Sequence, residues 1–282
     1  MKPIDLSISL VSFNNKGLLE NCLNSIFHNN KDLKFEVSLV DNASKDGTAT
    51  MVKKKFPKVA LIVNDRNVLF TKAHNQNLRG TRGKYFLLLN DDTYIPPLAL
   101  EKMVDFLEAH PEIGAASAKH IGQNGKTDNT TSRFPTPLTE LLESNILAKF
   151  IGGKKVLNHY RYQGWKRNSD KYVDVLPGSF MLIRSSVLKK VGHFDENLKL
   201  FYSDTDLCIR IKKAGYSLYH KGDIVIKHFR AQSVNKLSPW ERYRLSETDM
   251  LNFYKKHFGA LWWFFLVIAY FPNRIYWRLK TI

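Results

Sequence analysis

The sequence predicts an α/β fold with a mostly parallel central sheet flanked by helices. Short apolar segments alternate with amphipathic stretches from the N-terminus to about residue 120. The order strand, helix, strand is typical of parallel sheets, because a crossover helix must return the chain to the starting edge. The predicted strands of this region span residues 6–13, 35–40, 59–63, 85–89 and 114–118.

The clearest helix of this region follows the first strand. Its apolar positions, which include Leu19, Cys22 and Ile26, recur at helical spacing after the candidate capping residues Asn14 and Asn15. This periodicity predicts an amphipathic helix that covers one face of the sheet.

The second half of the chain is less regular. Residues 132–174 lose clear periodicity and are rich in aromatic and basic side chains, which predicts a loop-rich insertion. Order returns with a strand over 175–183, a helix over 204–214 closed by Gly215, and a strand over 224–229. We expect a C-terminal helical extension beyond residue 240.

Residues 260–271 of that extension form a continuous apolar and aromatic run, followed by Arg274, Arg278 and Lys280. Twelve residues are too few for a membrane span, which needs about 20. Aromatic residues beside cations favour a helix that lies on an anionic membrane surface, broken or kinked at Pro272. The alternative is a helix packed on the catalytic domain or in a dimer interface.

The composition limits the compartment but not the partner. The net charge of +17 requires negative partners or a solvated basic surface, and nucleic acid, anionic lipid and sugar nucleotides all qualify. The two cysteines, Cys22 and Cys208, fall on apolar helix faces and are expected to be buried, reduced thiols. No signal-peptide pattern opens the sequence, so we expect a cytoplasmic protein.

Polar residues gather directly after the predicted strands. In open α/β sheets ligands bind in the crevice outside the carboxyl ends of the strands, so these residues should converge. They are Ser12 and Asn14, then Asp41 and Asn42, then Asn90, Asp91 and Asp92.

The acidic pair of this set predicts a metal site. No glycine-rich phosphate loop follows any strand, so a bound phosphate would have to be neutralised by a metal or by side chains. Asp91 and Asp92 leave a very hydrophobic strand and could bridge a divalent cation to phosphate oxygens. The alternative is that they cap a turn ahead of Pro96 and Pro97.

A second acidic pair opens the predicted helix 204–214. Capping explains one of Asp204 and Asp206 but hardly requires both, and a carboxylate held in a cleft can act as a general base. His228 ends an apolar strand; such a residue is more often structural than a ligand.

These pieces resemble, in order, the motifs of glycosyltransferase family 2, over residues 5 to about 260. The resemblance is closest to a bacterial branch of rhamnosyltransferases. It is carried by Leu10-Val11-Ser12-Phe13-Asn14, Val40-Asp41-Asn42-Ala43-Ser44-Lys45-Asp46-Gly47, Leu89-Asn90-Asp91-Asp92-Thr93, Gly178-Ser179-Phe180-Met181-Leu182, Phe194-Asp195-Glu196, Asp204-Thr205-Asp206-Leu207-Cys208 and Asn252-Phe253-Tyr254-Lys255-Lys256-His257-Phe258-Gly259.

The resemblance implies a GT-A fold and an inverting, metal-dependent transfer of a sugar from a nucleotide diphosphate donor. The donor would be a dTDP-rhamnose or a UDP-sugar, and the acceptor a glycan or lipid-linked sugar in bacterial cell-surface polysaccharide synthesis. In the GT-A domain, residues 1–240, residues 1–120 would bind the nucleotide sugar and 121–240 the acceptor. Residues 241–282 would form the helical extension, and 260–282 would hold the enzyme on the inner face of the cell membrane.

Roles follow by position in the motifs. Asp92 and His228 would hold Mn²⁺ or Mg²⁺, and a nitrogen ligand favours manganese. Asp204 would be the catalytic base, supported by Asp206. Ser12 and Phe13 would lie along the nucleoside, and Asp41 would bind its uracil or thymine ring. The implied nucleotide-binding residues are Ser12, Phe13, Asn14, Asp41, Asn42, Asn67, Asn90 and Asp91.

The chain departs from the family pattern at two positions. Leu69 stands where a glycine is usual, which predicts a differently shaped loop on the donor side. Ser203 stands where an acidic residue is usual, which leaves Asp204 as the clearer base candidate.

Two other functions would share some of these sequence features. A sugar nucleotidyltransferase would also use a parallel sheet and a metal, but it would carry a glycine-rich loop after the first strand. A noncatalytic nucleic-acid-binding protein would explain the positive charge. It would leave both acidic pairs unexplained, because carboxylates repel phosphate unless a metal intervenes. We therefore expect no nucleic-acid partner.

Overall fold

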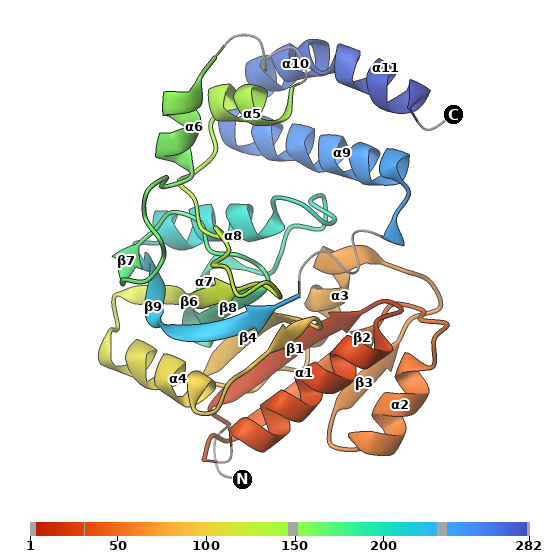
Figure 1. Ribbon diagram of the computed structural model, residues 1–282, viewed down its shortest axis with the longest axis vertical. Coiled ribbons are helices and arrows are strands. Elements are labelled where there is room, and N and C mark those ends of the chain that lie inside the picture. The colour runs from red at the N-terminus through yellow and green to blue at the C-terminus, as the bar shows by residue number, and fades with distance from the viewer. Residues whose placement is uncertain (1–3, 31, 146–151, 230–235, 281–282) are drawn as a thin grey trace.

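Figure 1 shows the computed structural model of the protein, which describes residues 4–30, 32–145, 152–229 and 236–280. Within these ranges nine strands form one sheet, in the order β3-β2-β1-β4-β8-β6-β9-β5 with β7 paired to β9. The strands are β1 (Leu6–Ser12), β2 (Phe35–Asp41), β3 (Ala60–Val63), β4 (Tyr85–Asn90), β5 (Thr93–Tyr94), β6 (Ile113–Ile121), β7 (Lys171–Tyr172), β8 (Phe180–Arg184) and β9 (Ser217–His228). The helices are α1 (Lys16–Asn29), α2 (Thr48–Lys55), α3 (Leu69–Leu78), α4 (Ala99–Ala109), α5 (Pro137–Ser144), α6 (Lys154–Tyr160), α7 (Ser185–Val191), α8 (Ser203–Lys213), α9 (Pro239–Phe258), α10 (Ala260–Ala269) and α11 (Phe271–Leu279).

The predicted α/β fold with flanking helices is confirmed. Strands β3, β2, β1 and β4 are parallel, as the alternating pattern predicts, while β8 runs antiparallel to both β4 and β6. The strand predicted over 175–183 starts only at Phe180. Pro177 lacks the backbone donor that a central strand needs, and the chain from Pro177 to Ser179 instead lines a cavity.

The strand register places the carboxyl ends of three strands at one edge. Ser12 of β1 lies opposite Asp41 of β2, and Val11 of β1 lies opposite Asn90 of β4. The polar residues that follow these strands are therefore neighbours in space.

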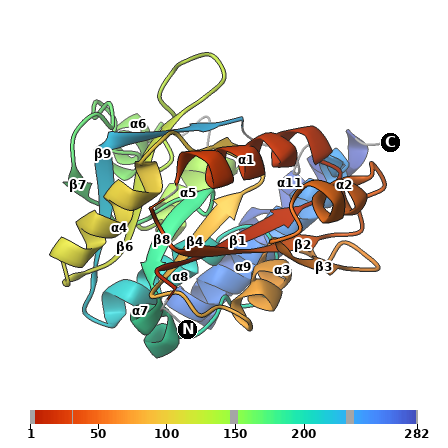
Figure 2. The same ribbon diagram turned by 90° about the horizontal axis from the view of Figure 1, so that it is seen from below.

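Helices cover both faces of the sheet. Leu87 and Leu89 point to the side packed with α1, α2 and α4, whereas Phe86 and Leu88 point to the side packed with α7 and α8. This alternation is the period of two that a strand buried on both faces shows. Figure 2 shows α1 and α4 on one side of the sheet and α7 and α8 on the other.

The region predicted to be loop-rich contains two short helices, α5 and α6. Thr136 caps α5, and its hydroxyl accepts a hydrogen bond from the Thr139 amide. Helices of 8 and 7 residues are too short to show a helical period. The prediction was wrong for these two segments, and residues 146–151 between them lie outside the described residues.

The predicted C-terminal helical extension is confirmed as a layer of three helices beyond α8 (Figure 1). Its inner side is a small core that includes Met250, Phe253 and Leu266. The apolar run breaks between α10 and α11 at Tyr270, two residues before Pro272.

The outer side of α10 and α11 is apolar and exposed. The exposed fractions are 81% for Leu261, 57% for Phe264, 60% for Phe271 and 68% for Leu279. Among the described residues no helix is long and apolar enough to cross a membrane. Residues 281 and 282 of the predicted membrane-associating segment lie outside the described part.

Candidate active site

A cavity of about 450 Å³ opens at the carboxyl ends of β1 and β4 and reaches the first turn of α8. It brings together most of the residues predicted from the sequence. Those that line it are Phe13, Asn42, Asn67, Asn90, Asp91, Asp92, Asp204 and His228. Four predicted residues, Ser12, Asn14, Asp41 and Asp206, do not line it.

Asp92 and His228 face each other on one wall of this cavity. His228 is the last residue of β9, and its pairing with Thr93 of β5 brings it beside the acidic turn. Asp92 Oδ1 lies 3.1 Å from His228 Nε2, and Asn90 Nδ2 lies 3.3 Å from the same nitrogen. His228 Nδ1 is buried without a hydrogen-bond partner in the described part of the protein.

This arrangement fits a divalent cation. Carboxylate oxygens and imidazole nitrogens both bind divalent metals, and Asp92 Oδ1 is buried without a hydrogen-bond partner among the described residues. The described residues contain no group of three or more histidine, cysteine or acidic side chains that could hold a metal. A metal held by Asp92 and His228 would therefore need further ligands from a bound molecule or from water.

Asp91 is turned away from this pair toward α1. Its Oδ1 accepts a hydrogen bond of 3.0 Å from Asn15 Nδ2, and its Oδ2 is buried without a partner in the described part. Burial, reinforced by the charge of Asp92, raises the pKa of Asp91 to about 7. Asp91 and Asp92 thus occupy different environments, and a turn-capping role does not account for either.

Asp204 lines the opposite side of the cavity from the start of α8. Its Oδ2 accepts a hydrogen bond of 3.0 Å from the Gly178 amide, and its Oδ1 one of 2.7 Å from the Thr205 amide. Burial raises the pKa of Asp204, while these amide donors oppose the rise. Among the described residues no cation pairs with Asp204, and a half-buried carboxylate with a raised pKa is suited to accept a proton from a ligand.

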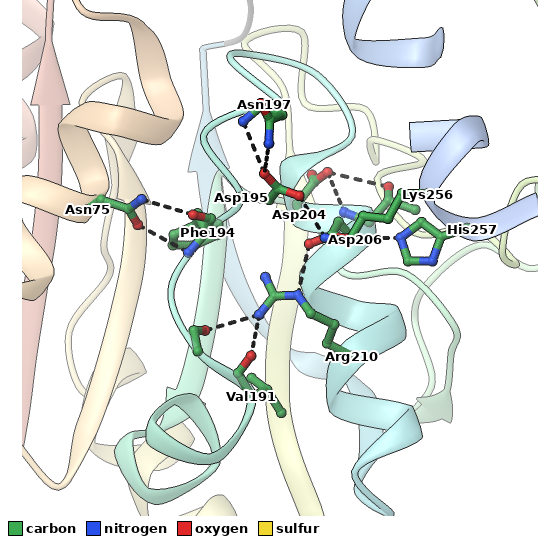
Figure 3. Close-up of polar contacts among 12 residues, drawn as sticks. Asn75, Val191, Phe194, Asp195, Asn197, Asp204, Asp206, Arg210, Lys256 and His257 are labelled. Atoms are coloured by element: carbon green, nitrogen blue, oxygen red, sulfur yellow. Dashed lines mark hydrogen bonds and ion pairs between the residues drawn. The ribbon is translucent and has the colours of Figure 1, made fainter. Parts of the chain in front are cut away.

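Asp206, predicted to support Asp204, does not line this cavity. Figure 3 shows its carboxylate facing α9. His257 Nε2 and Lys256 Nζ lie 2.8 Å and 2.7 Å from its Oδ1, and Arg210 Nε lies 2.8 Å from its Oδ2. Burial alone would raise the pKa of Asp206, but the hydrogen bonds from His257, Lys256 and Arg210 outweigh it and hold the pKa well below the ordinary value.

Asp249, a carboxylate on α9, fixes the loop that leads into α8. Asp249 is fully buried, and it accepts hydrogen bonds of 3.0, 2.8 and 2.9 Å from the amides of Lys199, Leu200 and Phe201. Leu200 lines the cavity. Helix α9 therefore supports the Asp204 side of the cavity from behind, a role that the sequence did not reveal.

Ser12, Asn14 and Asp41, which the resemblance assigns to the nucleotide, do not line the cavity, whereas Asn42 does. Asn14 Oδ1 accepts a hydrogen bond of 2.6 Å from the Lys45 amide, and Asp41 Oδ1 one of 3.3 Å from the Ser44 amide. Asn42 Oδ1 accepts one of 3.0 Å from Asn64 Nδ2. Ser12 is fully buried at the end of β1. These side chains shape the loops that follow β1 and β2.

Leu69 keeps a backbone conformation that favours glycine, although its side chain is large. Its φ is +66°, in the left-handed region, and it begins α3 with the Asn67 side chain capping its amide at 2.9 Å. A branched residue pays roughly 1–2 kcal/mol for this conformation. The loop is therefore glycine-like at this position, and its side chain joins the cavity wall.

His74 lines the cavity and Lys236 precedes the lining residue Leu237, and neither was singled out from the sequence. His74 is buried, and its Nδ1 lies 2.7 Å from Ser9 Oγ; burial lowers its pKa to about 3, so it is neutral. Lys236 Nζ donates to the Phe13 carbonyl at 2.9 Å and to that of Asn14. Both contacts join residues far apart in the chain, so no local sequence pattern predicts them.

Solved structures show the class to which this fold belongs. The chain superposes on S. aureus TarS in complex with UDP with a TM-score of 0.55 and 22% identity, over 88% of this chain. That match spans 66% of the TarS chain, slightly less than two thirds. A Pyrobaculum calidifontis mannosyltransferase in complex with GDP-Man and Mn²⁺ gives a TM-score of 0.56 at 17% identity, over 100% of this chain and 84% of that one. The protein has the GT-A fold of glycosyltransferases.

The sequence places the chain within that class. Residues 7–192 match the profile of glycosyl transferase family 2, and the chain belongs to this family. It is 25% identical over 211 residues to an N-acetylglucosaminyl-diphospho-decaprenol L-rhamnosyltransferase of Mycobacterium tuberculosis, covering 71% of this chain and 68% of that protein. It is also 25% identical over 280 residues to an uncharacterized glycosyltransferase of Methanocaldococcus jannaschii, covering 95% of this chain and 86% of that protein.

Proposed function

We propose that the protein transfers one sugar, with inversion, from a nucleotide diphosphate sugar to a hydroxyl of a glycan or lipid-linked acceptor. One observation carries the proposal: the carboxylate of Asp204, which makes no ion pair in the described part, and the Asp92–His228 pair line the same cavity. A proton acceptor and a diphosphate-binding pair in one cavity are the groups that a single displacement at the anomeric carbon needs.

Asp204 would take the proton from the acceptor hydroxyl as its oxygen attacks the anomeric carbon. The bond from that carbon to the diphosphate oxygen breaks as the new bond forms, so the configuration inverts. Asp92 and His228 would hold Mn²⁺ or Mg²⁺, which supplies positive charge to the departing diphosphate. Phe13 and Asn42 line the nucleoside side of the cavity, which Asp41 and Asn14 shape from behind.

The donor and acceptor classes rest on similarity together with the site. The M. tuberculosis relative is a rhamnosyltransferase named for a diphospho-decaprenol substrate, and the TarS structure holds UDP. We propose a dTDP- or UDP-sugar donor bound by residues 1–120. The acceptor would be a lipid-linked sugar of cell-surface polysaccharide synthesis, bound by residues 121–240.

A membrane surface would present such an acceptor, and the C-terminal helices suit one. The exposed apolar residues of α10 and α11, among them Trp262 and Phe265, stand beside Arg278 and Lys280. Apolar side chains bordered by cations bind the interface of an anionic bilayer. The protein would then act at the inner face of the cell membrane.

Thermal unfolding with a panel of sugar nucleotides tests the donor site. A ligand that binds only the folded state raises the melting temperature. We expect one nucleotide class to raise it, and the rise to require Mn²⁺ or Mg²⁺. A folded protein whose melting temperature responds to no donor, with or without metal, would contradict the proposal.

A further inference from the structure

A second cavity lies outside the active site. It has a volume of about 540 Å³ and lies between the segment that leads into α5 and the helix α6. Arg133 and Phe134 line it from the first, and Lys155, Val156 and His159 from the second. Figure 1 shows α5 and α6 together beside the layer of C-terminal helices.

Within the described part the cations of this cavity lack a carboxylate partner, while the Arg133 guanidinium lies over the Tyr162 ring at 4.9 Å and Lys155 is exposed on α6. Neither Arg133 nor Lys155 makes an ion pair within the described part of the chain, and Arg133 Nε is buried there without a hydrogen-bond partner. The one lining carboxylate, Asp174, is held by Lys212 Nζ at 2.8 Å. By contrast, the neighbouring Arg161 pairs with Glu143 at 2.5 Å. A buried guanidinium nitrogen without an acceptor, beside a second unpaired cation, favours an anionic ligand.

The cavity is joined to the active site through one short segment. Thr130 lines the active-site cavity, and Arg133, three residues on, lines the second cavity. The Arg133 amide donates to the Tyr160 carbonyl at 2.8 Å. Burial raises the pKa of Tyr160 to about 12, and nearby carboxylates, Asp204 among them, add to the rise. The second cavity is therefore within electrostatic reach of the candidate base.

Helix α5, which lines the cavity through Thr139, contacts α10 of the C-terminal layer. Asn145 Nδ2, just after α5, donates to the Ala269 carbonyl of α10 at 2.7 Å, and Tyr270 hydroxyl lies 3.0 Å from Glu140 Oε1 of α5. Phe134 and Val156 give the cavity an apolar part. A ligand with a charged head and an apolar tail could place its head at Arg133 and Lys155 and its tail toward α10.

We propose that this cavity binds the diphosphate of a prenyl-diphosphate-linked acceptor, so that the sugar attached to the diphosphate reaches Asp204. The proposal rests on the proposed function and names its acceptor site. Arg133 and Lys155 would bind the phosphate oxygens, and Phe134 and Val156 would contact the first part of the prenyl chain.

Calorimetric titration of the full chain with farnesyl diphosphate tests the proposal. Chelator in the buffer removes the metal on which the donor cavity depends. We expect farnesyl diphosphate to bind more tightly than inorganic pyrophosphate, because the apolar part contacts the chain. Arg133→Gln and Lys155→Ala should each weaken the binding of farnesyl diphosphate about tenfold or more. Lys154→Ala is the matched control, because Lys154 precedes Lys155 on α6 but does not line the cavity, and it should bind normally.

Several results would overturn the assignment. Equal affinity for pyrophosphate and farnesyl diphosphate would show that the prenyl chain makes no contact with the cavity, which would then be a phosphate site only. Normal binding by Arg133→Gln and Lys155→Ala would place the ligand elsewhere, as would displacement by the donor nucleotide in chelator. The metal-dependent rise in melting temperature with donor should persist in both variants. Its absence from the wild type would count against the proposed function, whereas its presence with unchanged farnesyl diphosphate binding would count against this cavity alone.

Discussion

The two sides of the first turn of α8 differ as sharply as any two regions of the molecule. Asp204 faces the active-site cavity and is half-buried, and its partners in the described part are the amides of Gly178 and Thr205 and the Thr205 hydroxyl. Asp206 faces α9, has no exposed side-chain surface, and is surrounded by Arg210, Lys256 and His257. Two residues along a helix are about 200° apart around its axis, so the motif sends its carboxylates to opposite faces.

The same contrast extends beyond α8. On the cavity side, Asp91 Oδ2 and His228 Nδ1 are buried without partners in the described part, and Leu69 is held at positive φ. On the α9 side, both oxygens of Asp206 and of Asp249 are hydrogen-bonded, and the exceptions there are Arg210 Nη2, which is buried without a partner in the described part, and Tyr202, whose φ is +60°. Unsatisfied groups and strained backbone are expected where a protein binds a ligand, and paired groups where it supports structure. Substitutions on the cavity side should therefore change the chemistry, and those on the α9 side should change stability.

Asp204→Asn should have the largest effect. The amide cannot accept the acceptor proton, so kcat should fall roughly 10³-fold. The stability of the protein and the metal-dependent rise in melting temperature with donor should be kept, because the side chain has the same shape. Steady-state kinetics and thermal unfolding measure the two. Normal turnover in this variant would remove Asp204 as the base.

Asp92→Ala should affect metal-dependent binding of the donor rather than proton transfer from the acceptor. Loss of one side of the Asp92–His228 pair should lower kcat/KM roughly 10²-fold and shift metal activation to higher Mn²⁺ concentration. Titration of the rate with Mn²⁺ checks this. Asn29→Ala, remote from the cavity lining, is a control that should activate at the wild-type concentration. An unchanged activation curve for Asp92→Ala would separate this pair from the metal.

Asp206→Asn should destabilise the protein and leave the chemistry largely intact. Removing one partner of a buried ion cluster costs roughly 3 kcal/mol in the free energy of unfolding. Because the pKa of Asp206 is depressed in the folded state, its contribution is present above the unfolded value near 4 and is lost as the pH falls. The difference between variant and wild type in urea unfolding should therefore shrink below about pH 4. An Asp206→Asn variant with wild-type stability but no catalytic turnover would show that Asp206 acts in the chemistry and not in stability.

Leu69 gives the smallest effect. Glycine relieves the left-handed strain at this position and alanine does not, so Leu69→Gly should be more stable than Leu69→Ala by about 1 kcal/mol. Helical sites normally show the opposite order. Urea unfolding of both variants measures the difference, and a more stable alanine variant would show that the strain is absent.

The sequence predicted the cavity side better than the α9 side, for a physical reason. Parallel strands bring their carboxyl ends to one edge, so Asn42, Asn90 and Asp92 could be grouped from their positions after strands. His228 could be added only by resemblance, because its place depends on the pairing of β9 with β5.

The partners of Asp206 and the loop held by Asp249 could not be predicted in this way. Lys256 and His257 come from a helix about 50 residues further on, and its packing on α8 is a tertiary contact that no local pattern encodes. The helices α5 and α6 were missed because each has only about two turns. The second cavity, which lies between them, was hidden for the same reason.

The pH dependence of a single turnover tests the contrast between Asp204 and Asp206 most directly. With enzyme in excess of donor, the rate of sugar transfer should fall as the pH is lowered. The midpoint should lie above the value near 4 of an ordinary aspartate, because burial raises the pKa of Asp204. The midpoint should be the same in Asp206→Asn. A rate that stays flat down to pH 4, or a midpoint that moves with Asp206→Asn, would contradict the assignment of Asp204 as the base.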